Sequence, residues 1–150
     1  MSMLELILEH VRTAVPFADL VGVDVQTVDD GAAVARLEAR PAVHNHIGTL
    51  HAGALFTLGE AASGAAMAGA FAPVLLSVRP VAADARIVYR RPARGTVTAA
   101  ADVVGDPADL LAELERVGKV RFRVDVRMED ERHREVATME VDWHVSRTAS

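Results

Sequence analysis

The chain has 150 residues, of which 51% are hydrophobic and 25% charged, and this size and composition predict one globular domain over residues 1–150. Its formal net charge of −5 gives no overall attraction to nucleic acid or to an anionic membrane, so we expect neither as a partner. The absence of cysteine excludes disulfides, thiol nucleophiles and thiolate metal sites. The first residues lack the basic region of a signal peptide, which predicts a cytoplasmic protein.

The N-terminal part of the chain predicts a helix followed by two strands. Apolar side chains at helical spacing predict a helix at residues 1–15, which Pro16 ends. An alternating strand is expected at residues 23–26, then a turn at Asp29-Asp30-Gly31 and a second strand at residues 33–39. These two strands should form a hairpin.

The next element is a long helix from about His51 to Ala70, with Thr49 or His51 as the candidate cap. Its roughly 18–20 residues correspond to about 27–30 Å at about 1.5 Å per residue. The uncharged run after Glu60 is mostly alanine and glycine and is broken by Pro73. This composition favours a buried helix over a membrane span.

From Asp84 onward the hydrophobic period changes to two, which indicates strands. They are expected at residues 84–91, 96–104, 117–129 and 134–146. Asp106 as N-cap and Pro107 at the first helical position predict a short helical insertion at residues 106–116. The order of elements predicts an α+β fold in which one antiparallel sheet of about six strands buries a single long helix. The other face of the sheet, which carries Lys119, Arg121, Arg123, Arg127 and Glu140, should meet solvent.

Glu60 is the only Asp, Glu, Lys or Arg between Pro41 and Val78. At 100° per residue it shares one stripe of the long helix with Gly53, Phe56, Ser63, Gly64 and Met67. The stripe begins among the unpaired N–H groups of the first turn, which can polarise a carbonyl oxygen. A carbonyl substrate is therefore expected between these N–H groups and the acid, unless Glu60 is a structural acid paired with an arginine of a neighbouring strand.

Two motifs carry a family resemblance. They are Asn45-x-x-Gly48-x-x-His51-Ala52-Gly53-Ala54-Leu55-x-x-Leu58-x-Glu60 and Ile87-x-Tyr89-x-Arg91-Pro92-Ala93-x-Gly95. Together they resemble the hot-dog fold acyl-CoA thioesterases of the PaaI type, and most closely an uncharacterised subgroup of hot-dog domains. The resemblance implies a sheet wrapped around the central helix. It also implies a homodimer, or a homotetramer built as a dimer of dimers, in which subunits pair edge to edge with the sites at the interface.

The resemblance further implies hydrolysis of an acyl-CoA thioester, with CoA as part of the substrate and no separate cofactor. Glu60 would act as general base or nucleophile, and burial would raise its pKa. Asn45 would place water or substrate, while the backbone N–H of Ala52 or Gly53 polarises the thioester carbonyl. His51 would either cap the helix or contact substrate. Substrate contacts are expected from the helix residues Phe56, Ser63, Gly64 and Met67.

The chain departs from the family pattern at three positions. Many similar enzymes carry aspartate where this chain has Glu60, and glycine where it has Ala52. Some carry a hydroxyl on the strand after the helix, at a register that falls near Ala82 here; Ser77 and Ser63 are possible substitutes.

Arg90, Arg91 and Arg94 form a local cationic cluster in an acidic chain, which suits the phosphate groups of CoA or else marks a solvated strand end. His44 and His46 have no nearby aspartate or cysteine to complete a metal site, so no metal is expected.

Two further functions remain open. A hot-dog hydratase or dehydratase would use a histidine and an acid for proton transfer, and His46 and Glu60 are the candidates. A non-catalytic acyl-CoA-binding domain would keep the pocket without turnover.

Overall fold

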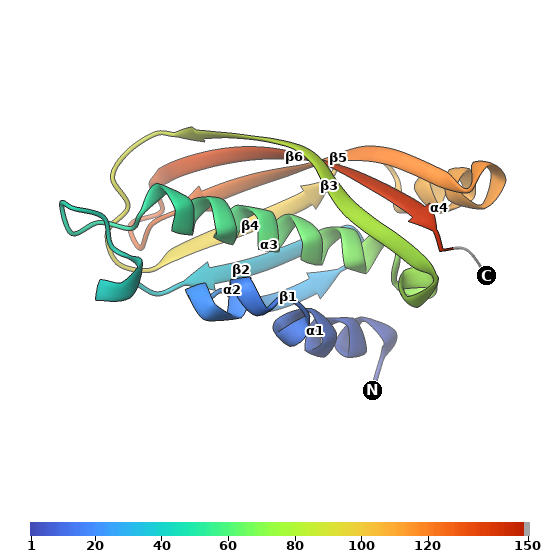
Figure 1. The fold of residues 1–150 in the computed structure, drawn as a ribbon, viewed down its shortest axis with the longest axis horizontal. Helices are drawn as coiled ribbons and strands as arrows, with labels where there is room; N and C mark the ends of the chain where they lie inside the picture. The colour runs from blue at the N-terminus through green and yellow to red at the C-terminus, as the bar shows by residue number, and fades with distance from the viewer. Residues whose placement is uncertain (149–150) are drawn as a thin grey trace.

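The long helix α3 (Ala52–Ala70) lies across the concave face of one antiparallel sheet (Figure 1). The computed structural model describes residues 1–148. The six strands lie in the order β1-β2-β4-β5-β6-β3. Their bounds are β1 (Asp24–Asp29), β2 (Ala32–Leu37), β3 (Val78–Tyr89), β4 (Val97–Val103), β5 (Lys119–Glu129) and β6 (Glu135–Arg147). The predicted α+β architecture, a six-stranded antiparallel sheet curved around one helix, is confirmed.

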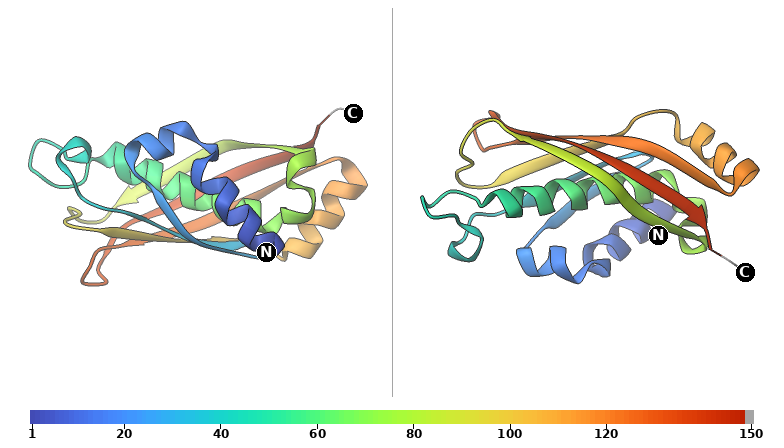
Figure 2. Two further views of the ribbon diagram at one scale, coloured as in Figure 1. Left: turned by 90° about the horizontal axis from the view of Figure 1, so that it is seen from below. Right: turned by 45° about the horizontal axis from the view of Figure 1, so that its top comes forward.

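Two N-terminal helices cover the side of α3 that the sheet leaves open, so that α3 lies in the middle of three layers (Figure 2). They are α1 (Met3–Ala14) and α2 (Pro16–Val21). A capping box between Ser2 and Glu5 fixes the start of α1. Because α3 has the sheet on one side and helices on the other, small alanine and glycine side chains let both layers pack close to it. Among residues 1–148, no helix combines the length and apolar content that crossing a membrane requires.

The small side chains of α3 allow close approach to the sheet. At Gly69 the helix lies so close to the end of β1 that a Cβ atom there would overlap the backbone carbonyl oxygen of Asp29. At Gly59 a Cβ atom would instead meet the flexible side chains of Met139 and Met128. The C-terminal end of α3 thus packs against the backbone of β1, whereas its middle packs against methionine side chains that can change conformation.

The turns and the helical insertion follow the sequence signals. The turn of the β1–β2 hairpin contains Gly31 at φ +85°, a conformation that glycine adopts without a steric penalty. Helix α4 (Pro107–Val117) begins at Asp106, whose side chain accepts a hydrogen bond from the Ala108 N–H, and ends at Gly118 in the left-handed region. Two short 3-10 helices, η1 (Pro41–Val43) and η2 (Ala72–Ser77), flank α3 along the chain.

Three elements differ from the sequence expectation. The segment around Phe17 folds as α2, because Pro16 begins this helix at its first position and Gly22 ends it at φ 100°. Strand β1 covers Asp24–Asp29 and so extends beyond the expected residues 23–26. Strand β3 begins at Val78 instead of Asp84. β3 is an edge strand whose side chains are mostly exposed, so its sequence lacks the alternation of apolar and polar residues that marks a half-buried strand. An edge position also tolerates Pro80, which has no N–H to donate.

Candidate active site

Glu60 lies in the third turn of α3 and is half-buried. Among residues 1–148 no cation lies close enough to form an ion pair with its carboxylate. Burial raises the pKa of Glu60 above its ordinary value of 4.5, because removal from water disfavours the charged form. The alternative in which a strand arginine neutralises this acid is not seen in the part of the chain that the structure describes.

Glu60 lines a largely apolar cavity of about 290 Å³ between α3 and the N-terminal helices. Its walls include Val11 and Ala14 of α1, Gly64 and Ala68 of α3, and Trp143 of β6. An apolar cavity of about 150 Å³ is large enough to bind benzene. The cavity beside Glu60 therefore has room for a larger apolar group.

The first turn of α3 presents one open backbone donor. His51 is the N-cap residue, and its Nδ1 accepts a hydrogen bond of 2.8 Å from the Gly53 N–H. Within residues 1–148 we find no acceptor for the Ala52 N–H. The helix start is exposed to solvent, so this donor can reach a ligand. Of the two predicted donors, Ala52 is the one that the cap leaves available.

Asn45 organises the loop before α3. Its Oδ1 accepts hydrogen bonds from the N–H groups of Ile47, at 3.1 Å, and Thr49, at 3.0 Å. Its Nδ2 donates to the Thr49 hydroxyl at 2.7 Å. Asn45 thus has the turn-forming role open to any asparagine, and its amide is engaged within the loop.

The predicted helix stripe divides between two environments. Gly64 and Met67 line the cavity together with Glu60, whereas Gly53 and Phe56 lie nearer the exposed helix start and outside the cavity wall. Ser63 is fully buried. Because the sheet curves around α3, residues on one stripe meet different neighbours along the helix.

Ser63 has a structural role in this arrangement. Its hydroxyl donates to the Glu60 carbonyl oxygen at 2.7 Å and accepts from the Trp143 indole N–H at 3.0 Å. This pair fixes the Trp143 ring as a wall of the cavity. The Ser63 hydroxyl is therefore occupied and does not face the cavity, contrary to its predicted contact with substrate.

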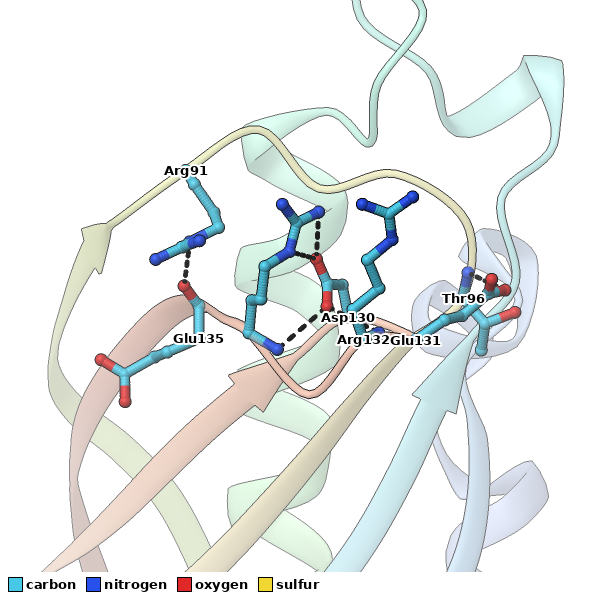
Figure 3. Close-up of polar contacts among 7 residues, drawn as sticks. Arg91, Thr96, Asp130, Glu131, Arg132 and Glu135 are labelled. Atoms are coloured by element: carbon cyan, nitrogen blue, oxygen red, sulfur yellow. Dashed lines mark hydrogen bonds and ion pairs between the residues drawn. The ribbon is translucent and has the colours of Figure 1, made fainter.

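The three arginines near the end of β3 have separate surroundings. Arg90 faces the outer side of the sheet, where it lies 3.7 Å from the Glu135 carboxylate and 3.2 Å from the Thr138 hydroxyl. The Arg91 Nε donates to the Glu135 backbone carbonyl at 3.0 Å, and Arg94 is exposed. Arg90 and Arg91 follow the end of β3 at Tyr89, and both contact Glu135, Arg90 at its carboxylate and Arg91 at its backbone carbonyl (Figure 3).

The remaining candidate positions lie outside the cavity wall. Ala82 is exposed on β3 opposite Trp143, and Ser77 is exposed at the end of η2. His46 lies on the exposed loop before α3 and does not approach Glu60 through the cavity. His44 is half-buried and pairs with Leu50 across an isolated bridge. Residues 1–148 contain no group of three side chains arranged to hold a metal ion.

Sequence reasoning missed the contribution of α1 and Trp143 to the cavity. The apolar stripe of α1 indicated that this helix packs on something, but the stripe carries no information about its partner. Trp143 falls within the strand expected at residues 134–146, but only the structure shows that it bonds to Ser63 and lines the cavity with Glu60.

The raised pKa of Glu60 predicts a pH-dependent cost to stability. The folded state binds the Glu60 proton more tightly than the unfolded state, so stability falls as pH rises from about 4.5 through the raised value. The neutral replacement Glu60→Gln should therefore be more stable than the unchanged protein at pH 8, with a gain that disappears near pH 4. Urea denaturation at both pH values measures the difference. A gain of equal size at both would show that ionisation of Glu60 is not its source.

The chain resembles known proteins in sequence and in fold. The family model for a domain of unknown function (DUF4442) matches residues 4–145. A protein of unknown function from Pseudomonas aeruginosa, described as a probable thioesterase, has 25% identity and a TM-score of 0.81, over 96% of this chain and 95% of its own. No curated protein matches the chain.

Two more distant structures share the fold. A thioesterase family protein from Silicibacter pomeroyi has 18% identity and a TM-score of 0.78, with 96% of this chain and 98% of the other covered. The E. coli PaaI protein, from the phenylacetic acid degradation operon, has 21% identity and a TM-score of 0.71, with 99% and 98% covered. These similarities confirm the hot-dog fold.

Proposed function

Because this chain belongs to the family of the domain of unknown function DUF4442, and has the hot-dog fold of the thioesterases it resembles, we propose that it hydrolyses an acyl-CoA thioester. The observation that carries this proposal is Glu60, an acid without a cation partner in the described residues, which lines an apolar cavity on the central helix. A carboxylate with a raised pKa is a stronger base than an ordinary one, and its proton transfer is better matched to neutral pH.

In the proposed reaction, the Glu60 carboxylate takes a proton from a water molecule, whose oxygen attacks the thioester carbonyl carbon. The carbonyl oxygen becomes an oxyanion that accepts a hydrogen bond from the Ala52 N–H at the positive end of the α3 dipole. The intermediate collapses with cleavage of the carbon–sulfur bond, and Glu60 returns the proton to the leaving thiolate. A nucleophilic role for Glu60, through an anhydride that water then hydrolyses, uses the same placement of groups.

The geometry favours two copies of the chain in this reaction. Ala52 and Glu60 are eight residues apart on one helix, which corresponds to about 12 Å along its axis. Groups that act on one carbonyl must each lie within about 3 Å of the reacting atoms. We therefore propose that Glu60 of one copy acts beside Ala52 of a second, in a dimer formed through the open edge of β3, as the family resemblance implies. His51 would then hold the helix start in place for the bound carbonyl.

The cavity suits the acyl part of such a substrate. Its walls come mainly from alanine, valine and other apolar side chains, with Glu60 at the wall where the reacting carbonyl would enter. Binding an apolar acyl group there would exclude water and strengthen the proposed hydrogen bond to the oxyanion. Small and medium apolar acyl groups match the volume of the cavity.

One observation favours a second candidate, an acyl-CoA-binding domain without turnover. The Asn45 amide is engaged in its own loop: its Oδ1 accepts two backbone N–H groups, and its Nδ2 donates to the Thr49 hydroxyl and, at 3.5 Å, to the Leu50 carbonyl oxygen. Such a domain would use the cavity in the same way, but its acyl-CoA ligand would remain intact.

The direct test is a panel of short, medium, long and aromatic acyl-CoAs, with release of free thiol as the readout and loss of the enoyl double bond as a second. We expect thiol release with a maximum at small or medium acyl groups, from a protein that sediments as a dimer at micromolar concentration. Binding without thiol release would favour the non-catalytic domain. Loss of the double bond without thiol release would favour a hydratase, and a stable monomer would contradict the two-copy site.

A further inference from the structure

The central helix α3 carries three glycines beyond its first turn, and packing explains only two of them. A Cβ atom at Gly69 would overlap the backbone of β1, and one at Gly59 would crowd methionine side chains of the sheet. At Gly64 the nearest atoms to a Cβ would be two carbons of the Trp143 ring, at 3.4 and 3.5 Å, which is ordinary van der Waals contact. An alanine side chain would therefore fit at Gly64.

The backbone of Gly64 does not call for glycine either. Gly64 lies inside α3 and is not among the glycines with positive φ. A glycine inside a helix lowers stability relative to alanine, because it loses more backbone entropy on folding. The missing side chain leaves space instead, and Gly64 lines the apolar cavity together with Glu60.

Gly64 lies in the middle of one long wall of this cavity. Glu60, Gly64 and Ala68 follow one another at four-residue spacing and all line the cavity, so they form one row along α3. The row spans about 12 Å along the helix axis. Val11 and Ala14 of α1 line the same cavity. The cavity is therefore elongated along α3, a shape that suits an extended chain.

The Trp143 ring beside Gly64 is held in place and does not close the space. Its indole N–H donates to the Ser63 hydroxyl at 3.0 Å, and this hydroxyl in turn donates to the Glu60 carbonyl oxygen at 2.7 Å. Trp143 is only 7% exposed and Ser63 is fully buried. Rotation of the ring toward Gly64 would break a buried hydrogen bond, which is costly. The room beside Gly64 is thus kept for a ligand.

We propose that Gly64 determines the acyl specificity of this site, because its missing side chain leaves the path along which a straight-chain acyl group of medium length extends from Glu60 to Ala68. This inference deepens the proposed function and rests on it, since it takes the apolar ligand to be the acyl part of a thioester. The methylene groups of such a chain would lie along the row, and a side chain at position 64 would project into their path. Each buried methylene should strengthen binding about fourfold, which corresponds to about 0.8 kcal/mol.

Binding of alkyl-CoA thioethers tests this role without turnover, because a thioether lacks the carbonyl group that hydrolysis requires. Calorimetric titration compares ethyl-CoA with octyl-CoA, and we expect the unchanged protein to bind octyl-CoA more tightly. The two methyl groups of valine in Gly64→Val would take the place of roughly two methylenes, so octyl-CoA binding should weaken about tenfold. The affinity for ethyl-CoA should stay the same, because its short chain does not extend past position 64.

Gly64→Ala distinguishes a ligand role from a packing role. The added Cβ atom fits beside Trp143, so the urea midpoint should rise, while octyl-CoA affinity should fall about fourfold. Gly59→Ala is the matched control on the same helix, because Gly59 faces the sheet and does not line the cavity; it should leave the affinity for both thioethers unchanged. A Gly64→Ala variant with lower stability and unchanged octyl-CoA affinity would show that Gly64 is a packing position and would overturn the proposal.

Hydrolysis of a short and a longer thioester separates this role from the proposed function. The ratio of kcat/KM for octanoyl-CoA to that for acetyl-CoA should fall about tenfold in Gly64→Val. An unchanged ratio with unchanged octyl-CoA affinity would overturn the role of Gly64 and leave hydrolysis standing. Weaker octyl-CoA binding by Gly64→Val, without hydrolysis of either thioester by the unchanged protein, would support the role and overturn hydrolysis. Equal affinity of the unchanged protein for the two thioethers would overturn the proposal.

Discussion

The substitution Glu60→Gln is expected to lower kcat for acyl-CoA hydrolysis about 10²–10⁴-fold, the usual contribution of a general base. Glutamine keeps the size of the side chain and its place in the cavity wall but has no basic carboxylate. The rest of the site is unaltered, so the affinity for free CoA should stay the same. Initial rates of thiol release, measured over a range of acyl-CoA concentrations, give kcat and KM separately.

Two comparisons show whether the loss is specific to the Glu60 carboxylate. Glu60→Asp should retain more activity than Glu60→Gln, because aspartate keeps a carboxylate that can accept a proton. Glu113→Gln, an exposed replacement on α4, should leave kcat unchanged. If Glu60→Gln hydrolysed acyl-CoA at the rate of the unchanged protein, Glu60 would not be the catalytic base and the site assignment would fail.

The largest effect on stability is expected from Gly69→Ala at the C-terminal part of α3. The new Cβ atom would overlap the Asp29 carbonyl oxygen, so either the helix or the end of β1 must move. Overpacking of this kind typically costs about 1–3 kcal/mol and occasionally more. Alanine returns up to about 1 kcal/mol through its better helix propensity. A backbone atom yields less readily than a side chain, so we expect a net loss of at least about 2 kcal/mol in the free energy of unfolding.

Gly59→Ala is the matched control on the same helix. Its Cβ atom would meet the ends of the Met139 and Met128 side chains, which can adopt other rotamers. The gain in helix propensity then offsets most of the cost, and the free energy of unfolding should change by less than about 1 kcal/mol. Urea denaturation of both variants measures the contrast. Equal stability of the two would show that the contact between α3 and β1 at Gly69 is not a tight one.

The substitution Glu60→Gln is expected to lower the catalytic rate and to raise the stability of the protein. The carboxylate that is needed for the proposed chemistry is half-buried without a cation partner in the described residues, and this burial lowers stability above the raised pKa. A more stable and less active Glu60→Gln variant would be the expected signature of an acid retained for chemistry. Loss of both stability and activity would instead indicate a structural acid.

The sequence by itself determined the architecture and the helix that carries the acid. The change of hydrophobic period near Asp84, the cap at Asp106 and the turn at Gly31 are local signals, each set by backbone geometry within a few residues. Glu60 was found because a lone acid in an apolar run is visible without knowledge of its neighbours. The motif around it also pointed to the fold before any contact was known.

Only the tertiary structure decided which groups surround Glu60 and which remain free. Whether α1 or solvent faces Gly64, whether Ser63 binds a ligand or the Trp143 indole, and whether Glu131 meets the Thr96 N–H all depend on contacts between segments far apart in the chain. Periodicity gives the direction of a side chain relative to its own element. It does not give the neighbour that this side chain meets, because that neighbour is set by how the elements pack.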